Sequence, residues 1–136
     1  MLLHRAIYVS DAVGDAATSL LVLVEILGGA ERNNRRDGLT GVLMRHDGRF
    51  LQAIEGRRDD VDRLMGRLRA DPRHENLRLL SDTDVSCRLF GDWPMTLAEL
   101  TPAAGRLLNG GGLDQLGPDR AEAVLIAAAE ALPVPA

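Results

Sequence analysis

The sequence is poor in cysteine, in aromatic residues and in long hydrophobic runs. Cys87 is the single cysteine and cannot form an internal disulfide, which excludes a disulfide-rich secreted scaffold and favours a reducing compartment. The apolar run at 20–27 is interrupted by Glu25 and is far shorter than the roughly 20 residues needed to span a bilayer. The N-terminal residues also lack a signal-peptide pattern. We therefore expect a cytoplasmic protein with no membrane partner.

Basic charge and aromatic side chains are also scarce. The formal net charge is −4 and the isoelectric point is about 5.3, whereas nucleic-acid-binding surfaces are normally basic. Aromatic residues make up 3% of the chain, which leaves few rings on which bases could stack. We therefore expect no nucleic-acid partner. The 46% of apolar residues and the length of 136 are typical of one globular domain with a hydrophobic core.

The first half of the chain alternates between strand and helix patterns. Residues 4–10 alternate in polarity, with Ile7 and Val9 on one face and Tyr8 on the other, which predicts a strand. Thr18 or Ser19 is a suitable N-cap for a following helix. The apolar stripe of that helix is expected to contain Leu20, Leu23, Leu27, Ala30 and Asn34.

Two further strands and a second helix are predicted next. The strands span 39–46 and 49–55, and the Asp47-Gly48 pair between them is a strong hairpin signal. A helix then begins near Asp59-Asp60, whose carboxylates favour a helix N-terminus. It ends before Pro72. Its buried stripe is expected to be Val61, Leu64 and Leu68.

Residues 77–86 and 88–97 have the character of two more strands. The order β-α-β-β-α-β-β predicts an α/β (α+β) fold, a ferredoxin-like five-stranded sheet with two helices on one face. Thr101-Pro102 and Pro118 then open two C-terminal helices, ending near 109 and 132 and joined through the glycines at 110–112. We expect these helices to cover the other face, as a 99–136 extension of a 1–98 domain.

Three polar residues lie on faces that are otherwise expected to be buried. They are Gln52, which shares a strand face with Phe50, Tyr8 on the first strand, and Asn34 on the first helix. A buried polar group without a partner costs about 1–3 kcal/mol, and two amides with a phenol suit a heterocycle bearing carbonyls and ring nitrogens. Taken singly, each residue has a plainer explanation as part of the core or of a helix end. The residues alone predict a small α/β domain with a polar-lined pocket between its two helices.

Five segments together resemble one family. HRAIYVS, RNNRRDGLTGVL, DGRFLQAIEG, DPRHENLRLL and RLFGDWPM follow one another in the order found in BLUF domains, the blue-light-sensing flavin-binding family. The resemblance extends from about Leu3 to Leu97. It departs at Pro94, where a small polar residue is commoner, and because proline removes a ladder N–H we expect that position at a strand edge or bulge.

The resemblance implies a flavin bound non-covalently between the two helices, usually FAD, with FMN or riboflavin possible. Asn33 and Asn34 would hold the polar edge of the ring, and Ile26 and Leu68 would sandwich its faces. Phe50 would close the pocket, Arg67 would reach toward the phosphate side, and no metal site is implied.

The resemblance also implies a photoreceptor that performs no turnover and is therefore not an enzyme. Blue light would drive electron and proton transfer from Tyr8 to the flavin, and the amide of Gln52, which bridges the two, would rotate or tautomerise. Trp93 and Met95 complete the photoactive set. Output would pass through their strand and the C-terminal helices to a separate effector in trans, and we expect a homodimer or higher homo-oligomer.

Three alternatives remain at this point. An RNA-recognition domain has the same strand order but needs exposed aromatic residues on its central strands. A small acylphosphatase-like enzyme could use Asn34 and Arg67 as an anion cradle, but it would also want a glycine-rich anion loop. A module of the BLUF fold that binds flavin without responding to light, or serves as a scaffold, is the third, because Pro94 and the Gly28-Gly29 pair could alter the pocket.

Overall fold

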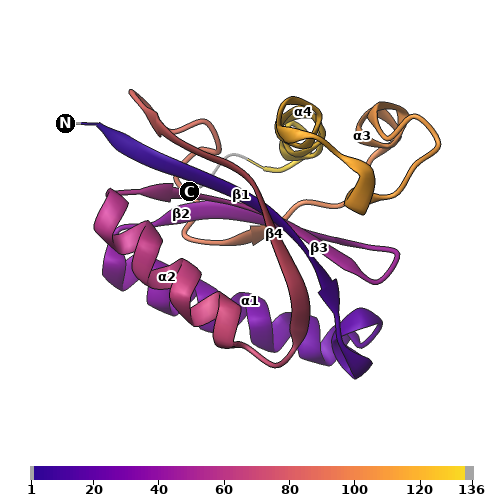
Figure 1. Cartoon of the computed structure of the whole chain (residues 1–136), viewed down its shortest axis with the longest axis horizontal. Helices are drawn as coiled ribbons and strands as arrows, with labels where there is room; N and C mark the ends of the chain where they lie inside the picture. Colours follow the sequence, from indigo (N-terminus) through magenta and orange to yellow (C-terminus); the bar gives the residue numbers. More distant parts are fainter. Residues whose placement is uncertain (1, 134–136) are drawn as a thin grey trace.

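The structure is a computed structural model that describes residues 2–133, and its centre is a five-stranded sheet between two helical layers (Figure 1). The strands are β1 (Leu3–Ala12), β2 (Thr40–His46), β3 (Arg49–Gly56), β4 (His74–Val85) and β5 (Thr96–Leu97). The helices are α1 (Leu20–Asp37), α2 (Arg58–Ala70), α3 (Pro102–Leu107) and α4 (Pro118–Ala129), with short 3-10 helices η1 (Gly14–Ala17) and η2 (Leu113–Gln115).

The strands lie in the order β4-β1-β3-β2-β5, and all neighbours are antiparallel except β2 and β5. Helices α1 and α2 cover one face of the sheet, and α3 and α4 cover the other (Figure 1). The predicted ferredoxin-like βαββαββ fold is therefore confirmed. None of the helices within residues 2–133 is long and apolar enough to cross a membrane.

Alternation along β1 divides the core between the two faces. Ile7 and Val9 belong to the buried cluster that includes the residues of α3 and α4, whereas Tyr8 packs with residues of α2. This follows from the two-residue period of a strand, which places successive side chains on opposite faces. The same period gives β3 two buried faces, one of which carries Leu51 and the other Gln52.

Local signals place the element boundaries near where they were predicted. Ser19 caps α1 by accepting a hydrogen bond from the Val22 N–H at 3.2 Å. Asp47 and Gly48 both have positive φ, 53° and 75°, which is the conformation that a two-residue type I′ hairpin requires. Thr101 caps α3 through the Ala104 N–H at 3.2 Å. Each cap satisfies a backbone donor that the first helical turn would leave unpaired.

One residue of the predicted helical stripe is wrong. Leu20 is 70% exposed, whereas Leu23 and Asn34 are buried and Leu27 and Ala30 are partly buried. At 3.6 residues per turn, Leu20 projects about 60° away from Leu23, so it falls at the margin of the face that meets the sheet. Leu21 and Val24 are exposed beside it, at 69% and 56%.

The predicted strand at 88–97 is also wrong in extent, because β5 contains only Thr96 and Leu97. The preceding residues, 86–95, form an irregular segment that we call the β4–β5 loop. Gly91 in this loop has φ 69°, and Pro94 has no N–H to give to a ladder. β4 begins at His74, three residues earlier than predicted, because its start pairs with the end of β1.

Candidate functional site

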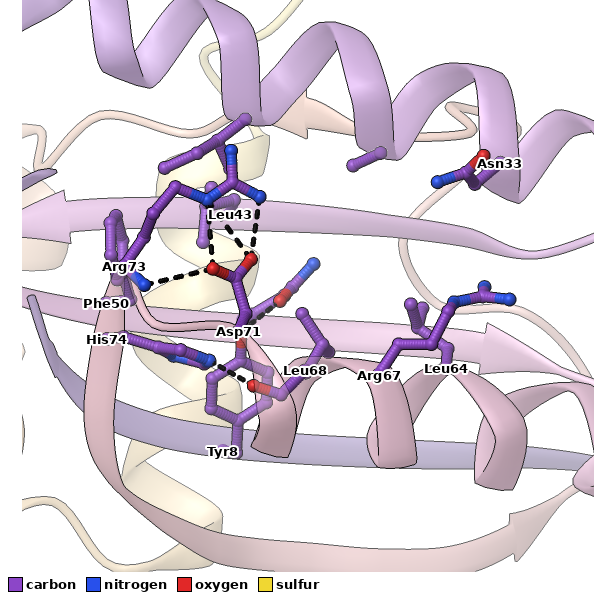
Figure 2. Close-up of a pocket in the computed structure, with 13 residues that line it drawn as sticks. Tyr8, Asn33, Leu43, Phe50, Leu64, Arg67, Leu68, Asp71, Arg73 and His74 are labelled. Carbon is purple, nitrogen blue, oxygen red and sulfur yellow. Dashed lines mark hydrogen bonds and ion pairs between the residues drawn. The ribbon is translucent and has the colours of Figure 1, made fainter.

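A pocket opens between α1, α2 and the sheet, and it encloses about 720 Å³ including its open mouth (Figure 2). Its lining comes from α1 and α2, from strands β1 to β4 and from the segment between α2 and β4. The lining residues are Tyr8, Ile26, Ala30, Asn33, Leu43, Phe50, Gln52, Leu64, Arg67, Leu68, Asp71, Arg73 and His74.

Tyr8 and Gln52 are directly opposite each other on β1 and β3. The Tyr8 hydroxyl donates a hydrogen bond to Gln52 Oε1, and the two residues are only 2% and 4% exposed. Burial, with a smaller contribution from the carboxylate of Asp71, raises the pKa of the Tyr8 phenol well above its usual value. The phenol is therefore held protonated, as a donor to the amide oxygen.

The other end of the Gln52 amide faces Met95. Gln52 Nε2 donates to Met95 Sδ at 3.5 Å, and Met95 is buried. A thioether sulfur is a weak acceptor, whereas an amide NH2 can donate two hydrogen bonds. Gln52 thus has a strong partner on its oxygen and a weak one on its nitrogen. The nitrogen end retains capacity for an acceptor brought into the pocket.

Trp93 lies away from Gln52. It packs against the core cluster shared with α3 and α4, on the opposite face of the sheet from the pocket. Its carbonyl accepts from the Gly41 N–H at 3.0 Å, and its ring lies so close to Gly91 that a Cβ there would sit 2.9 Å from it. Met95, and not Trp93, is therefore the residue of the photoactive pair that contacts Gln52.

The consecutive asparagines have different surroundings. Asn33 lines the pocket and is otherwise exposed, whereas Asn34 is fully buried beside it. Asn34 Nδ2 donates to the Pro94 carbonyl at 2.7 Å. Its Oδ1 is one of the buried side-chain atoms without a hydrogen-bond partner among the described residues. Adjacent helical residues project about 100° apart, so the pair divides between the pocket and the β4–β5 loop.

The walls of the pocket are mostly apolar. Ile26 comes from α1 and Leu64 and Leu68 come from α2, while Phe50 and Leu43 form the floor on the sheet. Ile26 and Asn33 are seven residues apart, about two helical turns, and so lie on one face of α1. Figure 2 shows Asn33 and Arg67 on facing helices. Arg67 also reaches Asp37 Oδ2 at 3.3 Å.

The segment after α2 adds three polar residues that the sequence reasoning did not assign to the site. Arg73 binds Asp71 through Nε at 3.0 Å and through its terminal nitrogen at 2.6 Å, and these bonds hold the pKa of Asp71 below its usual range (Figure 2). His74 hydrogen-bonds the Leu68 carbonyl and Ser10 Oγ, the latter at 2.7 Å. In the sequence these residues belong to the DPRH motif, in which a proline ends the helix and three polar side chains surround it.

The donors and walls fit a flat heterocycle with a polar edge. Apolar side chains from two helices face each other across the pocket, and amide and guanidinium groups lie on its lining. The weakly paired nitrogen of Gln52, which lines the pocket, is a site where a ligand's acceptor would stabilise the protein, whereas the unpartnered oxygen of Asn34 is buried behind the lining. No group of three or more His, Cys, Asp or Glu in the described part of the chain could hold a metal ion.

The fold and the pocket define a small-molecule-binding α+β domain, and comparison with known proteins identifies its family. Residues 3–96 match the BLUF family, described as sensors of blue-light using FAD, and the chain belongs to that family. Photoactivated adenylate cyclase subunit beta of Euglena longa is 36% identical over 93 residues. These residues are 68% of this chain but 11% of the relative, so the chain matches only a small part of that protein's length.

Two solved structures extend the similarity to nearly the whole chain. BlrB, a BLUF protein in its dark state, is 29% identical, with a TM-score of 0.77 over 96% of this chain and 98% of its own. The photo-activated state of BlsA has a TM-score of 0.87 over 98% of this chain and 99% of its own. At 24% identity, the likeness to BlsA establishes the fold alone.

Proposed function

We propose that this chain is a blue-light photoreceptor that holds a flavin in the pocket and signals by reorganising the hydrogen bonds of Gln52. The observation that carries the proposal is the buried row from Tyr8 through Gln52 to Met95, of which Tyr8 and Gln52 line the pocket. Membership of a family of FAD-using blue-light sensors supports it.

The residues that would hold the flavin fall into two groups. Ile26 and Leu68 would contact the two faces of the ring, with Phe50 beneath it. Asn33 and Asn34 would bind its polar edge, and Arg67 would reach a phosphate. We propose FAD as the bound form, with FMN and riboflavin as the other outcomes of an identification experiment.

A bound flavin absorbs blue light and, when excited, accepts an electron from a nearby aromatic donor. Tyr8 is suited to be that donor, because it is the chain's one tyrosine and its phenol is held protonated against Gln52. The phenolic proton has a direct path to Gln52 Oε1 along the hydrogen bond. Light-driven loss of an electron and a proton from Tyr8 would therefore act first on the amide.

Exchange of the two ends of the Gln52 amide is favoured by its partners. A phenol can either donate or accept, so Tyr8 would have a good hydrogen bond with either end of the amide. Only the contact with Met95 Sδ would be weakened, and that contact is already poor. We propose that this low cost allows Gln52 to serve as the switch, by rotation or by tautomerisation.

Signal output is proposed to leave the pocket through Met95. Met95 ends the β4–β5 loop immediately before β5, and the helices that follow cover the opposite face of the sheet (Figure 1). We propose that the changed loop and helices act on a separate effector protein in trans, with the photoreceptor assembled as a homo-oligomer.

The test is the spectrum of the purified protein. We expect a yellow protein that releases about one flavin per chain on denaturation and shows a reversible red shift after blue illumination. A folded protein that stays colourless when flavin is added would overturn flavin binding. A yellow protein with an unchanged spectrum after illumination would instead identify a flavin-binding module without a light response.

A further inference from the structure

Glu55 is a buried carboxylate that has no contact with the pocket. It lies on β3 three residues after Gln52, and its side chain points to the opposite face of the sheet, the face covered by α3 and α4. It is 0% exposed. A carboxylate this deeply buried is stable only when charge-assisted hydrogen bonds compensate its lost hydration.

Both oxygens of Glu55 are occupied by donors. Oε2 accepts from Arg5 Nε at 2.8 Å and from the backbone N–H of Leu89 at 2.8 Å, and Oε1 accepts from the N–H of Phe90 at 3.0 Å. Two of these donors belong to the β4–β5 loop. The carboxylate takes the backbone hydrogen bonds that residues 89 and 90 would otherwise give to a strand, which explains why no strand forms there.

Hydrogen bonds from Arg88 also hold this region of the loop against the sheet. Its guanidinium donates to the Glu55 carbonyl at 3.0 Å, to Thr40 Oγ1 at 2.6 Å and to the Gly38 carbonyl at 2.9 Å. Phe90, the next residue but one, is 1% exposed in the core cluster with α4. The loop is thus clamped at residues 88–90, while its other end contacts Gln52 through Met95.

Arg5 connects the clamp to the C-terminal helix. Arg5 Nε donates to Glu55, while Nη1 lies 3.8 Å from Glu122 Oε2 on α4 and Nη2 donates to the Cys87 carbonyl at 3.4 Å. Arg5 is itself buried against this face. One guanidinium therefore contacts β3, the loop and α4 together.

We propose that Glu55 is a positioning residue for signal output: it clamps the β4–β5 loop so that a change at Gln52 and Met95 reaches α4. The inference rests on the proposed function, because it concerns how the Gln52 switch is transmitted. With residues 88–90 held, a displacement of Met95 moves the short segment between the two attachments and the elements that pack on it. Without the clamp, the loop absorbs that displacement.

The test uses the full chain carrying flavin and the variant Glu55→Gln, with Glu99→Gln as a matched control on an exposed glutamate. An amide in place of Glu55 keeps the shape, but its NH2 meets a backbone N–H donor-to-donor. Three quantities are measured: the red shift, the light-induced change in Trp93 fluorescence, and the light-induced change in amide exchange over 118–129. Trp93 is the single tryptophan, so its emission reports on the loop.

We expect Glu55→Gln to keep the red shift and to lose most of the light-induced change in Trp93 emission and in α4 exchange. Glu99→Gln should match the wild type in all three. Light-induced changes of wild-type size in Glu55→Gln would overturn the proposal. A merely structural role would alter the dark protein without separating the red shift from the response of α4.

Two further measurements keep the proposal decisive. In darkness, the amides of Leu89 and Phe90 should exchange faster in Glu55→Gln than in Glu99→Gln, and equal rates would refute the clamp even if no red shift were found. A missing red shift in the wild type would count against the proposed function alone. If Glu55→Gln does not fold, the light response of α4 is measured in Glu122→Gln instead. The Glu122 side chain is 37% exposed, so this substitution should leave the protein folded. An undiminished light response of α4 in that variant would overturn transmission through Arg5.

Discussion

Tyr8 and Gln52 face each other across the β1–β3 ladder, and the phenol donates its hydrogen bond to the amide oxygen. Strand register alone sets this pairing, since each residue is directly opposite the other. Both side chains lie on the face that α1 and α2 cover, and they end at the floor of the pocket. Because the two side chains are hydrogen-bonded, we expect the substitutions Tyr8→Phe and Gln52→Ala each to abolish the light response.

Tyr8→Phe removes the phenol while keeping the volume of the ring. We expect this variant to fold and to bind flavin but to show no red shift, because the donor of the electron and proton is lost. It also leaves Gln52 Oε1 without its donor, which should lower the free energy of unfolding by about 1–3 kcal/mol. Light-minus-dark spectra and urea denaturation measure the two effects, and a normal red shift would contradict the role of Tyr8.

Gln52→Ala removes the group that can exchange donor for acceptor beside Tyr8. The variant should remain yellow and show no red-shifted state after blue illumination. Trp93→Phe is the control: because Trp93 packs on the opposite face of the sheet, we expect its red shift to persist and only the rate of dark recovery to change. A reversible red shift of normal size in Gln52→Ala would refute the proposed switch.

Asn33→Ala and Asn34→Ala should differ in a way that the sequence could not predict. Asn33 lines the pocket, so its loss should weaken flavin retention with little effect on the stability of the flavin-free protein. Asn34 is buried and bonded to Pro94, so its loss should weaken retention and also lower the free energy of unfolding by about 1–3 kcal/mol. Flavin affinity and chemical denaturation of both variants check this. Unchanged affinity in Asn34→Ala would count against its placement at the ring.

Stability should depend on pH through His4, which is buried on β1 and bonded to Asp82 and Asp84 of β4. Burial alone would lower the pKa of His4, but the hydrogen bonds to the two carboxylates outweigh it and raise that pKa above 6.5. The folded state therefore binds the proton more tightly than the unfolded state. The stabilisation of the folded state by this proton is complete below the pKa of a free histidine, about 6.5, and is lost as pH rises through the pKa of His4 in the folded state.

Denaturation midpoints measured from about pH 6 to pH 9 should accordingly fall in the wild type as this stabilisation is lost. His4→Gln should lack that component of the pH dependence, and His46→Gln on β2 is the matched histidine control. If His4→Gln followed the wild-type curve, the β1–β4 contact would not be the source of the dependence.

Local sequence was sufficient wherever neighbouring residues control the backbone. Alternation at residues 4–10 predicted the strand and which of its residues share a face, and Asp47-Gly48 predicted the hairpin. Ser19 and Thr101 predicted two helix starts, since capping involves residues only three apart. The order of these elements was enough to predict the ferredoxin-like sheet.

Contacts between distant segments decided the rest. The apparent strand at 88–97 became a loop because Glu55, more than thirty residues earlier, binds the N–H groups of Leu89 and Phe90. Met95 rather than Trp93 meets Gln52, and Asn34 meets Pro94, for the same kind of reason. Propensity and periodicity describe residues within one turn or one strand of each other. A buried polar group takes whichever partner the fold brings within hydrogen-bonding distance, and that partner is known only once the layers have packed.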